Sequence, residues 1–186
     1  MRIIGGARRG LKLADVGEGD MAAHLRPTSD RVREAIFNLL INAHGNPVAG
    51  ARVLDLFAGT GALGLESLSR GAVSATFVED GAKALALIRA NIAKMRAEGE
   101  TQILRQDVRR LGPNPGEGYG LVFLDPPYGK GLGETALAAA QRGGWLASGA
   151  MVVWEEGSAP QIPAGFALTD QRKYGDTIVT LLKAPE

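Results

Sequence analysis

From Arg52 onward, short apolar segments alternate along the chain with segments whose apolar residues recur at helical spacing. The apolar segments are predicted to be strands, and they cover residues 52–57, 75–79, 101–105, 121–124, 150–154, 166–169 and 177–182. The segments at helical spacing cover residues 63–69, 81–96 and 132–141. Because strands that alternate with helices usually lie parallel to one another, this order predicts an α/β fold, in which helices cover an open, mostly parallel sheet on both faces.

The first 48 residues do not follow this alternation. Residues 2–13 mix β-branched residues with three glycines, which predicts a strand or hairpin, and the polar residues 14–25 are predicted to be a loop. Residues 29–43 carry apolar side chains at helical spacing and predict an amphipathic helix that ends at Gly45-Asn46-Pro47. We therefore expect one domain over residues 1–186, in which residues 1–48 form an N-terminal extension on the substrate side.

Composition excludes several classes of protein. With 45% hydrophobic and 22% charged residues, the 186-residue chain has the composition of one soluble domain. No apolar run approaches the roughly 20 residues that a membrane-spanning helix needs, and the N-terminus lacks the apolar centre of a signal peptide. The chain has no cysteine and two histidines, which excludes thiolate catalysis and a typical zinc site. We expect a cytoplasmic protein without a membrane partner or a metal.

The first predicted strand leads into a glycine-rich turn, Asp55-Leu56-Phe57-Ala58-Gly59-Thr60-Gly61, and a helix follows. Glycines let a ligand approach the backbone, and tight turns often need positive φ. Together with Gly64, these glycines fit the dinucleotide-binding pattern, so the turn alone does not separate NAD from S-adenosylmethionine. Glu79 ends the next strand, where its carboxylate can accept hydrogen bonds from ribose hydroxyls, although a solvated acid is the alternative.

A second motif, Asp125-Pro126-Pro127-Tyr128, directly follows a buried strand. Ligands of open α/β sheets bind beyond the carboxyl ends of the strands, so both motifs are expected to face one crevice. The two prolines make the segment rigid and extended, and a stiff turn without catalytic function is the alternative.

This motif suits a planar exocyclic amine of a nucleic-acid base. The lone pair of such an amine is delocalised into the ring, which makes the nitrogen a poor nucleophile. Asp125 and the Pro126 carbonyl can each accept one N–H bond, which favours a pyramidal nitrogen whose lone pair points at a methyl donor. Tyr128 can stack on the base once the base has left its helix.

Basic residues cluster at the N-terminus. Net charge is only +1, yet residues 1–12 carry Arg2, Arg8, Arg9 and Lys12 without an acid. We expect these residues to contact RNA phosphates, and a solvated or structural hairpin is the alternative.

Together the motifs carry a family resemblance. The segment Asp55–Gly64 resembles the S-adenosylmethionine-binding segment of class I methyltransferases, and Asp125-Pro126-Pro127-Tyr128 resembles their amino-methylating motif. The segments Arg2-Ile3-Ile4-Gly5-Gly6 and Arg26-Pro27-Thr28-Ser29-Asp30-Arg31-Val32-Arg33-Glu34, with Tyr174-Gly175 near the end, look like the RsmD family of 16S ribosomal RNA guanine-N2 methyltransferases. The resemblance covers almost the whole chain.

The resemblance implies a seven-stranded class I fold and roles for individual residues. Asp55, Phe57, Ala58, Gly59, Thr60 and Gly61 would hold the methionine part of S-adenosylmethionine, Glu79 the ribose, and Asp107 with Val108 the adenine edge. A solvated acid at a strand end is the alternative for Asp107. Arg26, Thr28 and Arg31 would line the N-terminal side of the site. The implied substrate is one guanine of 16S ribosomal RNA in the small subunit or its assembly intermediate, methylated by a monomer.

Three other functions compete with this one. The Asp-Pro-Pro-Tyr segment would also serve an adenine-N6 DNA methyltransferase, although the chain has no evident separate DNA-reading domain. An NAD-dependent oxidoreductase would need a hydride-handling constellation, which the sequence does not offer. A non-catalytic RNA-binding module is the third alternative.

Overall fold

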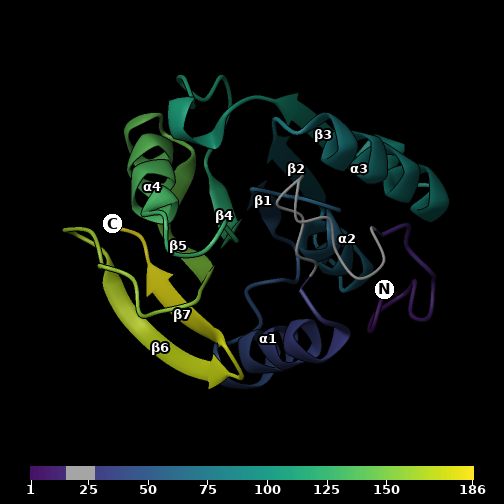
Figure 1. Cartoon of the computed structure of the whole chain (residues 1–186), viewed down its shortest axis with the longest axis horizontal. Helices are drawn as coiled ribbons and strands as arrows, with labels where there is room; N and C mark the ends of the chain where they lie inside the picture. Colours follow the sequence, from purple (N-terminus) through teal and green to yellow (C-terminus); the bar gives the residue numbers. More distant parts are fainter. Residues whose placement is uncertain (16–27) are drawn as a thin grey trace.

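A single seven-stranded sheet organises the chain in the computed structural model, which describes residues 1–15 and 28–186. The strand order is β3-β2-β1-β4-β5-β7-β6 (Figure 1). The five strands from β3 to β5 are parallel, and β7 pairs antiparallel with β5 and β6. The strands are β1 (Arg52–Leu56), β2 (Ser74–Glu79), β3 (Thr101–Arg105), β4 (Tyr119–Leu124), β5 (Leu146–Glu156), β6 (Ala167–Tyr174) and β7 (Thr177–Lys183).

Helices cover both faces of the sheet, as the alternating sequence predicts. Residues from α1, α2 and α3 share one apolar core with the sheet, and α4 and η2 share the other (Figure 1). Neighbouring strand residues point to opposite cores, as Val53 and Leu54 do on β1. The helices are α1 (Asp30–Ala43), α2 (Ala62–Ser69), α3 (Ala82–Met95) and α4 (Leu132–Arg142), with the short 3₁₀ helices η1 (Glu98–Glu100) and η2 (Val108–Arg110). Within the described residues, no helix has the length and apolarity to cross a membrane.

The fifth strand is longer than the sequence predicts. It begins at Leu146 rather than at residue 150 and runs through Gly149, whose φ is +64°. The register with β4 shifts between Tyr119 and Leu121, which leaves extra residues on β5 opposite Gly120. This bulge lets the strand continue past Gly149, although a glycine at this point in the sequence indicates the end of a strand.

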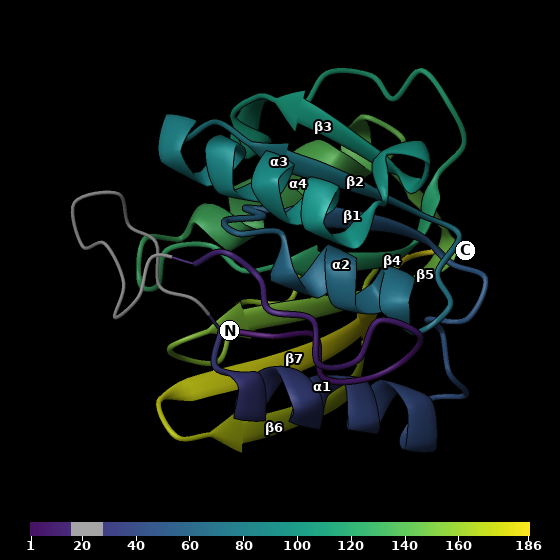
Figure 2. The same cartoon turned by 90° about the vertical axis from the view of Figure 1, so that its right-hand side faces the viewer.

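The first residues of the N-terminal extension pack into the core. Residues 1–15 form a narrow hairpin in which Ile3 N–H donates to the Leu11 carbonyl at 2.9 Å. The side chains of Ile3 and Leu13 are 0% and 5% exposed and belong to the core that α1, α2 and α3 cover. Figure 2 shows the hairpin, in purple, beside α2. The structure confirms the predicted hairpin, and its alternate apolar residues face inward.

A buried carboxylate joins this hairpin to α1 and α2. Glu66 of α2 is fully buried and accepts hydrogen bonds from the backbone N–H groups of Ile4 and Gly5 at 2.9 and 2.8 Å. Arg70 donates to Glu66 at 2.7 Å, and the guanidinium of the buried Arg33 lies 3.7 Å from Glu66. Two cations and two amides thus compensate one buried charge, which fixes three segments relative to one another.

Replacing Glu66 with glutamine is expected to destabilise the fold strongly. The amide keeps the size of the side chain but leaves the largely buried Arg70 without its anion and the buried Arg33 with Asp30 alone, which costs about 3–5 kcal/mol. Urea unfolding followed by circular dichroism measures this loss. The control is Glu100→Gln, which removes an exposed partner of Arg8 and is expected to cost at most about 1 kcal/mol. Similar losses for both variants would contradict the role of Glu66.

Candidate functional site at the carboxyl edge of the sheet

The glycine-rich turn leaves β1 at the carboxyl edge of the sheet in a strained conformation. Phe57 has φ +58°, which is unusual for a residue with a side chain, and Gly59 and Gly61 have φ +56° and +77°. Gly61 N–H donates to the Ala58 carbonyl at 2.7 Å, and α2 begins at the next residue. The turn therefore lies at the edge where ligands of such sheets bind.

Two carboxylates hold this turn in place. Asp55, which is 1% exposed, accepts the Gly64 N–H at 3.0 Å, and Glu79 accepts the Gly59 N–H at 2.9 Å. A Cβ on Gly64 would come within 2.5 Å of Phe77, so the third glycine of the motif serves helix packing. The motif thus combines two glycines for the turn with one for the contact between α2 and the sheet.

The Glu79 carboxylate accepts more hydrogen bonds from the protein backbone than a residue that only binds ribose would. Its second oxygen accepts hydrogen bonds from the backbone N–H groups of Asp80 and Gly81 at 3.0 and 2.9 Å. With the bond from Gly59, three of about four acceptor positions on the carboxylate are used. Glu79 therefore positions the backbone that follows β1 and the backbone that follows β2. It retains about one acceptor position for a ligand.

The remaining residues predicted to hold the cofactor lie nearby. The side chain of Thr60 is buried towards Met1, and its carbonyl accepts a hydrogen bond from Asn91 at 3.0 Å. Asp107 follows β3, starts η2 and is paired with Arg109 at 2.6 Å, and this hydrogen-bonded guanidinium lowers the Asp107 pKa. Val108 is buried beside it.

The Asp-Pro-Pro-Tyr segment follows β4, next to the glycine-rich turn. Asp125 N–H donates to the Leu56 carbonyl at 3.4 Å, which joins the two motifs across neighbouring strands. Pro126 is buried and Pro127 is half-buried. The Tyr128 hydroxyl forms a 3.1 Å hydrogen bond with the Thr177 hydroxyl, and a Cβ on Gly157 would lie 3.1 Å from the Tyr128 ring. The tyrosine ring is therefore held from two sides.

Glu155, near the end of β5, was not predicted from the sequence. The Thr28 hydroxyl donates to Asp125 at 3.2 Å and lies 3.5 Å from both carboxylate oxygens of Glu155. Thr28 thus lies between two carboxylates, one of which is Asp125. Glu155 follows an apolar strand segment just as Glu79 and Asp125 do, and this signal could have identified it.

Carboxylates at the ends of four neighbouring strands give this edge a negative potential. Asp55, Glu79, Asp125 and Glu155 belong to β1, β2, the end of β4 and β5. Burial raises the pKa of Asp55 well above its usual range, and the charges of Asp125 and Glu79 add to this effect. Burial and the charges of Asp125 and Asp55 likewise raise the Glu155 pKa, against smaller effects from Thr28 and Arg33.

The basic residues of the N-terminal hairpin are spread along α2. The open end of the hairpin lies near the site, where Ala14 N–H donates to Asn91 at 2.6 Å. Its tip lies at the other end of α2, where Ala7 N–H donates to the Ser69 carbonyl at 2.7 Å (Figure 2). Arg2 lies 3.6 Å from Asp30 and Arg8 lies 3.0 Å from Glu100, and Arg9, Lys12 and Arg31 are exposed. Arg26 lies outside the described residues.

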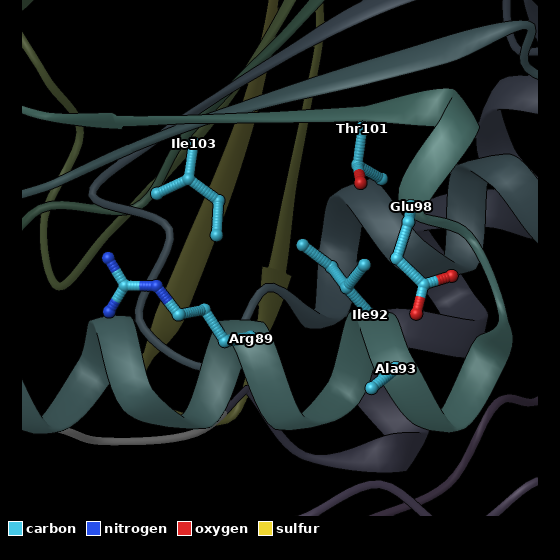
Figure 3. A pocket seen from close by; sticks show the side chains of 6 residues that line it. All are labelled: Arg89, Ile92, Ala93, Glu98, Thr101 and Ile103. Atoms are coloured by element: carbon cyan, nitrogen blue, oxygen red, sulfur yellow. The ribbon is translucent and has the colours of Figure 1, made fainter.

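A separate hollow lies between α3 and β3, away from the motifs. It has a volume of about 360 Å³ and is lined by Arg89, Ile92, Ala93, Glu98, Thr101 and Ile103 (Figure 3). The lining includes Thr101, the first residue of β3, and no residue of the carboxyl edge. None of these residues was predicted to be in the site.

The fold and the two motifs at its carboxyl edge define the class I methyltransferases. In agreement, the solved structure of the yhhF protein from Escherichia coli superposes with a TM-score of 0.84 at 36% sequence identity, over 100% of this chain and 98% of that chain. The family model described as conserved hypothetical protein 95 matches residues 1–183, and the chain belongs to this family.

Named relatives confirm the resemblance to the RsmD family. Ribosomal RNA small subunit methyltransferase D from Escherichia coli (strain K12) is 38% identical over 185 residues, which cover 97% of this chain and 88% of the relative. The protein of the same name from Haemophilus influenzae is 33% identical over 181 residues, with coverages of 94% and 89%.

Replacing Glu155 with glutamine is expected to stabilise the protein at neutral pH. A carboxyl group whose pKa rises on folding contributes stability below the ordinary glutamate pKa, and this contribution is lost as the pH rises through the raised value. Above that window the variant should gain on the order of 1 kcal/mol, or about 2–4 °C in Tm.

Thermal unfolding between about pH 4 and 8 measures this difference, which should shrink towards acid pH, where wild-type Glu155 is also neutral. The matched control is Glu117→Gln, because the Glu117 side chain is 90% exposed. A wild-type protein that is the more stable of the two at neutral pH would contradict the prediction.

Proposed function

We propose that this chain methylates the exocyclic N2 amine of a guanine in 16S ribosomal RNA of the small subunit, with S-adenosylmethionine as the methyl donor. The observation that carries the proposal is the pairing of β1 with β4, because it brings the glycine-rich turn beside Asp125. Membership of a family whose relatives include ribosomal RNA small subunit methyltransferase D supports the same substrate and favours RNA over the DNA alternative.

The negative charges at the carboxyl edge complement the positive charge of S-adenosylmethionine. S-adenosylmethionine carries a sulfonium, an ammonium and one carboxylate group, and a row of four carboxylates attracts its net positive charge. NAD would instead bring two phosphate charges to the same negative edge, which argues against an oxidoreductase. In this proposal the turn of Asp55 and residues 57–61 holds the methionine part, Glu79 the ribose, and Asp107 with Val108 the adenine. When bound, S-adenosylmethionine supplies an electrophilic methyl group.

Asp125 and Pro126 orient the acceptor amine. The Asp125 carboxylate and the Pro126 carbonyl each accept one N–H of the amine, which draws the nitrogen lone pair out of conjugation. The nitrogen gains a methyl group and loses one proton, which we assign to the Asp125 carboxylate. Tyr128 stacks on the base, and its hydrogen bond to Thr177 and its contact with Gly157 limit the orientations of its ring.

Residues 1–48 provide the RNA side of this site in the proposal. Thr28 contacts Asp125 directly, and Arg31 is exposed on the first turn of α1. The backbones of Arg2 and Lys12 form an antiparallel bridge near the open end of the hairpin. Their charges therefore lie closer to the site than those of Arg8 and Arg9. Phosphate contacts from these residues would position the RNA without reading its bases.

Wild-type protein is expected to transfer labelled methyl groups to small-subunit ribosomal RNA from cells that lack this protein, and not to DNA. Asp125→Ala should retain its affinity for S-adenosylmethionine but lose turnover by about 100-fold or more, because the variant cannot orient the amine. Calorimetry measures the affinity, and single-turnover transfer measures the rate.

Asp176→Ala, in the exposed turn between β6 and β7, is the control for loss of an acid and should keep full turnover. Loss of cofactor affinity in Asp125→Ala with normal turnover of the bound complex would contradict the role of Asp125. Transfer to DNA rather than to RNA would contradict the proposed substrate.

Neutralising two exposed cations of the hairpin is expected to weaken RNA binding. Arg9→Gln combined with Lys12→Gln removes two candidate phosphate contacts, so log affinity should depend on log salt concentration with a slope reduced by up to about two. Filter binding across a salt series measures this slope. The matched control is Arg142→Gln combined with Lys183→Gln, because both residues are exposed cations and they lie on α4 and β7 rather than on the hairpin.

Cofactor affinity should be the same in both double variants and in the wild type. An RNA affinity and salt slope equal to those of the wild type in Arg9→Gln/Lys12→Gln would reject the role of these two residues in phosphate binding.

A further inference from the structure

The carboxylate of Glu155 has unused acceptor capacity in a buried position. Glu155 is only 2% exposed, and among the described residues the group within hydrogen-bond distance of it is the Thr28 hydroxyl, at 3.5 Å from both oxygens, whose one proton also faces Asp125 at 3.2 Å. A carboxylate offers about four acceptor positions, and buried charges are normally satisfied by several donors. Asp55, with a firm bond from Gly64 at 3.0 Å, and Glu79, with three backbone donors, are used to build the turn, whereas Glu155 fixes no backbone.

The position of Glu155 in the sheet assigns it to the acceptor side of the site. The turn and Glu79 belong to β1 and β2, whereas β5 lies beyond β4 in the strand order. Neighbouring strands are about 4.8 Å apart, which separates β5 from β1 by about 10 Å and from β2 by about 14 Å. Asp125 is closer, because one Thr28 hydroxyl contacts both Asp125 at 3.2 Å and Glu155 at 3.5 Å.

Two neighbouring carboxylates match the Watson–Crick edge of guanine. That edge presents two adjacent donors, the N1–H and the N2 amine, and a flipped base is read on this edge. Adenine presents an acceptor at N1, which would oppose a carboxylate lone pair. A site that is built to bond one donor rejects analogues without it, because its own buried group is then left unpaired.

We propose that Glu155 determines the specificity for guanine by accepting the N1–H while Asp125 accepts an N–H of the N2 amine. The N1–H replaces the Thr28 hydroxyl, whose contacts with Glu155 are long enough to be exchanged at little cost. This inference rests on the proposed function, and it adds a residue that reads the base to those that perform the transfer.

The test uses two RNAs that differ at the target base. One carries guanine, and the other carries 2-aminopurine, which keeps the N2 amine but has an acceptor in place of the N1–H. The wild type should prefer guanine by about 10- to 100-fold in kcat/KM. Glu155→Gln should narrow this preference by about tenfold or more, because a glutamine amide can donate to the N1 acceptor of 2-aminopurine.

The matched control is Glu156→Gln, the next residue, whose carboxylate accepts the Gly129 N–H at 3.2 Å and the Gly157 N–H at 2.6 Å. Glu156 lies on the other side of the strand, so its variant should keep the wild-type preference whatever its rate. If Glu155→Gln is folded but too slow to assay, equilibrium binding of the two RNAs in the presence of S-adenosylhomocysteine gives the same ratio.

The results separate this inference from the proposed function. A narrowed preference in Glu155→Gln alone supports the assignment. The assignment is overturned, and the proposed function left intact, if the wild type methylates guanine and Glu155→Gln shows the same preference for guanine as the wild type. The preference is measured in kcat/KM or in binding. Failure of the wild type to methylate guanine in either RNA overturns the proposed function and the assignment with it.

Discussion

The buried carboxylate of Glu66 is the contact on which the arrangement of the first seventy residues depends. It accepts two backbone amides of the hairpin and the guanidinium of Arg70 at the end of its own helix, and it lies 3.7 Å from the guanidinium of Arg33 on α1. Arg33 extends the connection, because its guanidinium also donates to the carbonyls of Arg2 and Thr28. Since Thr28 donates to Asp125, one chain of polar contacts runs from the buried core to the edge of the sheet. The hairpin and α1 are therefore integral to the site.

Carboxylates at the edge of the sheet serve both structure and electrostatics. Asp55 and Glu79 accept backbone amides and so define the glycine-rich turn, while their charges add to the negative potential of the edge. Burial makes this concentration of charge costly, as the raised pKa of Asp55 and of Glu155 indicates. A positively charged ligand would reduce the repulsion between these carboxylates. The free energy that the repulsion costs the free protein is then recovered on binding, which favours such a ligand.

Much of this structure could be predicted from the periodicity of the apolar residues and from the glycines and prolines between the elements. All ten strands and helices expected after Arg52 are present, because apolar runs and glycines follow the sheet and its turns closely. The bulge at Gly149 could not be predicted, since one glycine fits a break as well as a bulge. The partners of Glu66 could not be predicted either, because its pairing with Arg33 and the hairpin arises only when distant segments pack. Glu155 belongs to no recognisable motif, although it is an acid near the end of an apolar strand segment, as Glu79 is.

The hydrogen bond between Tyr128 and Thr177 has a consequence for how the site is completed during synthesis. Translation delivers β1 and β2, which carry the glycine-rich turn, well before β7, although β7 inserts between β5 and β6 in the finished sheet. A nascent chain therefore contains every residue assigned to the methyl donor before the partner of Tyr128 has been synthesised. The aromatic ring proposed to stack on the base gains its hydrogen bond only once β7 has been made.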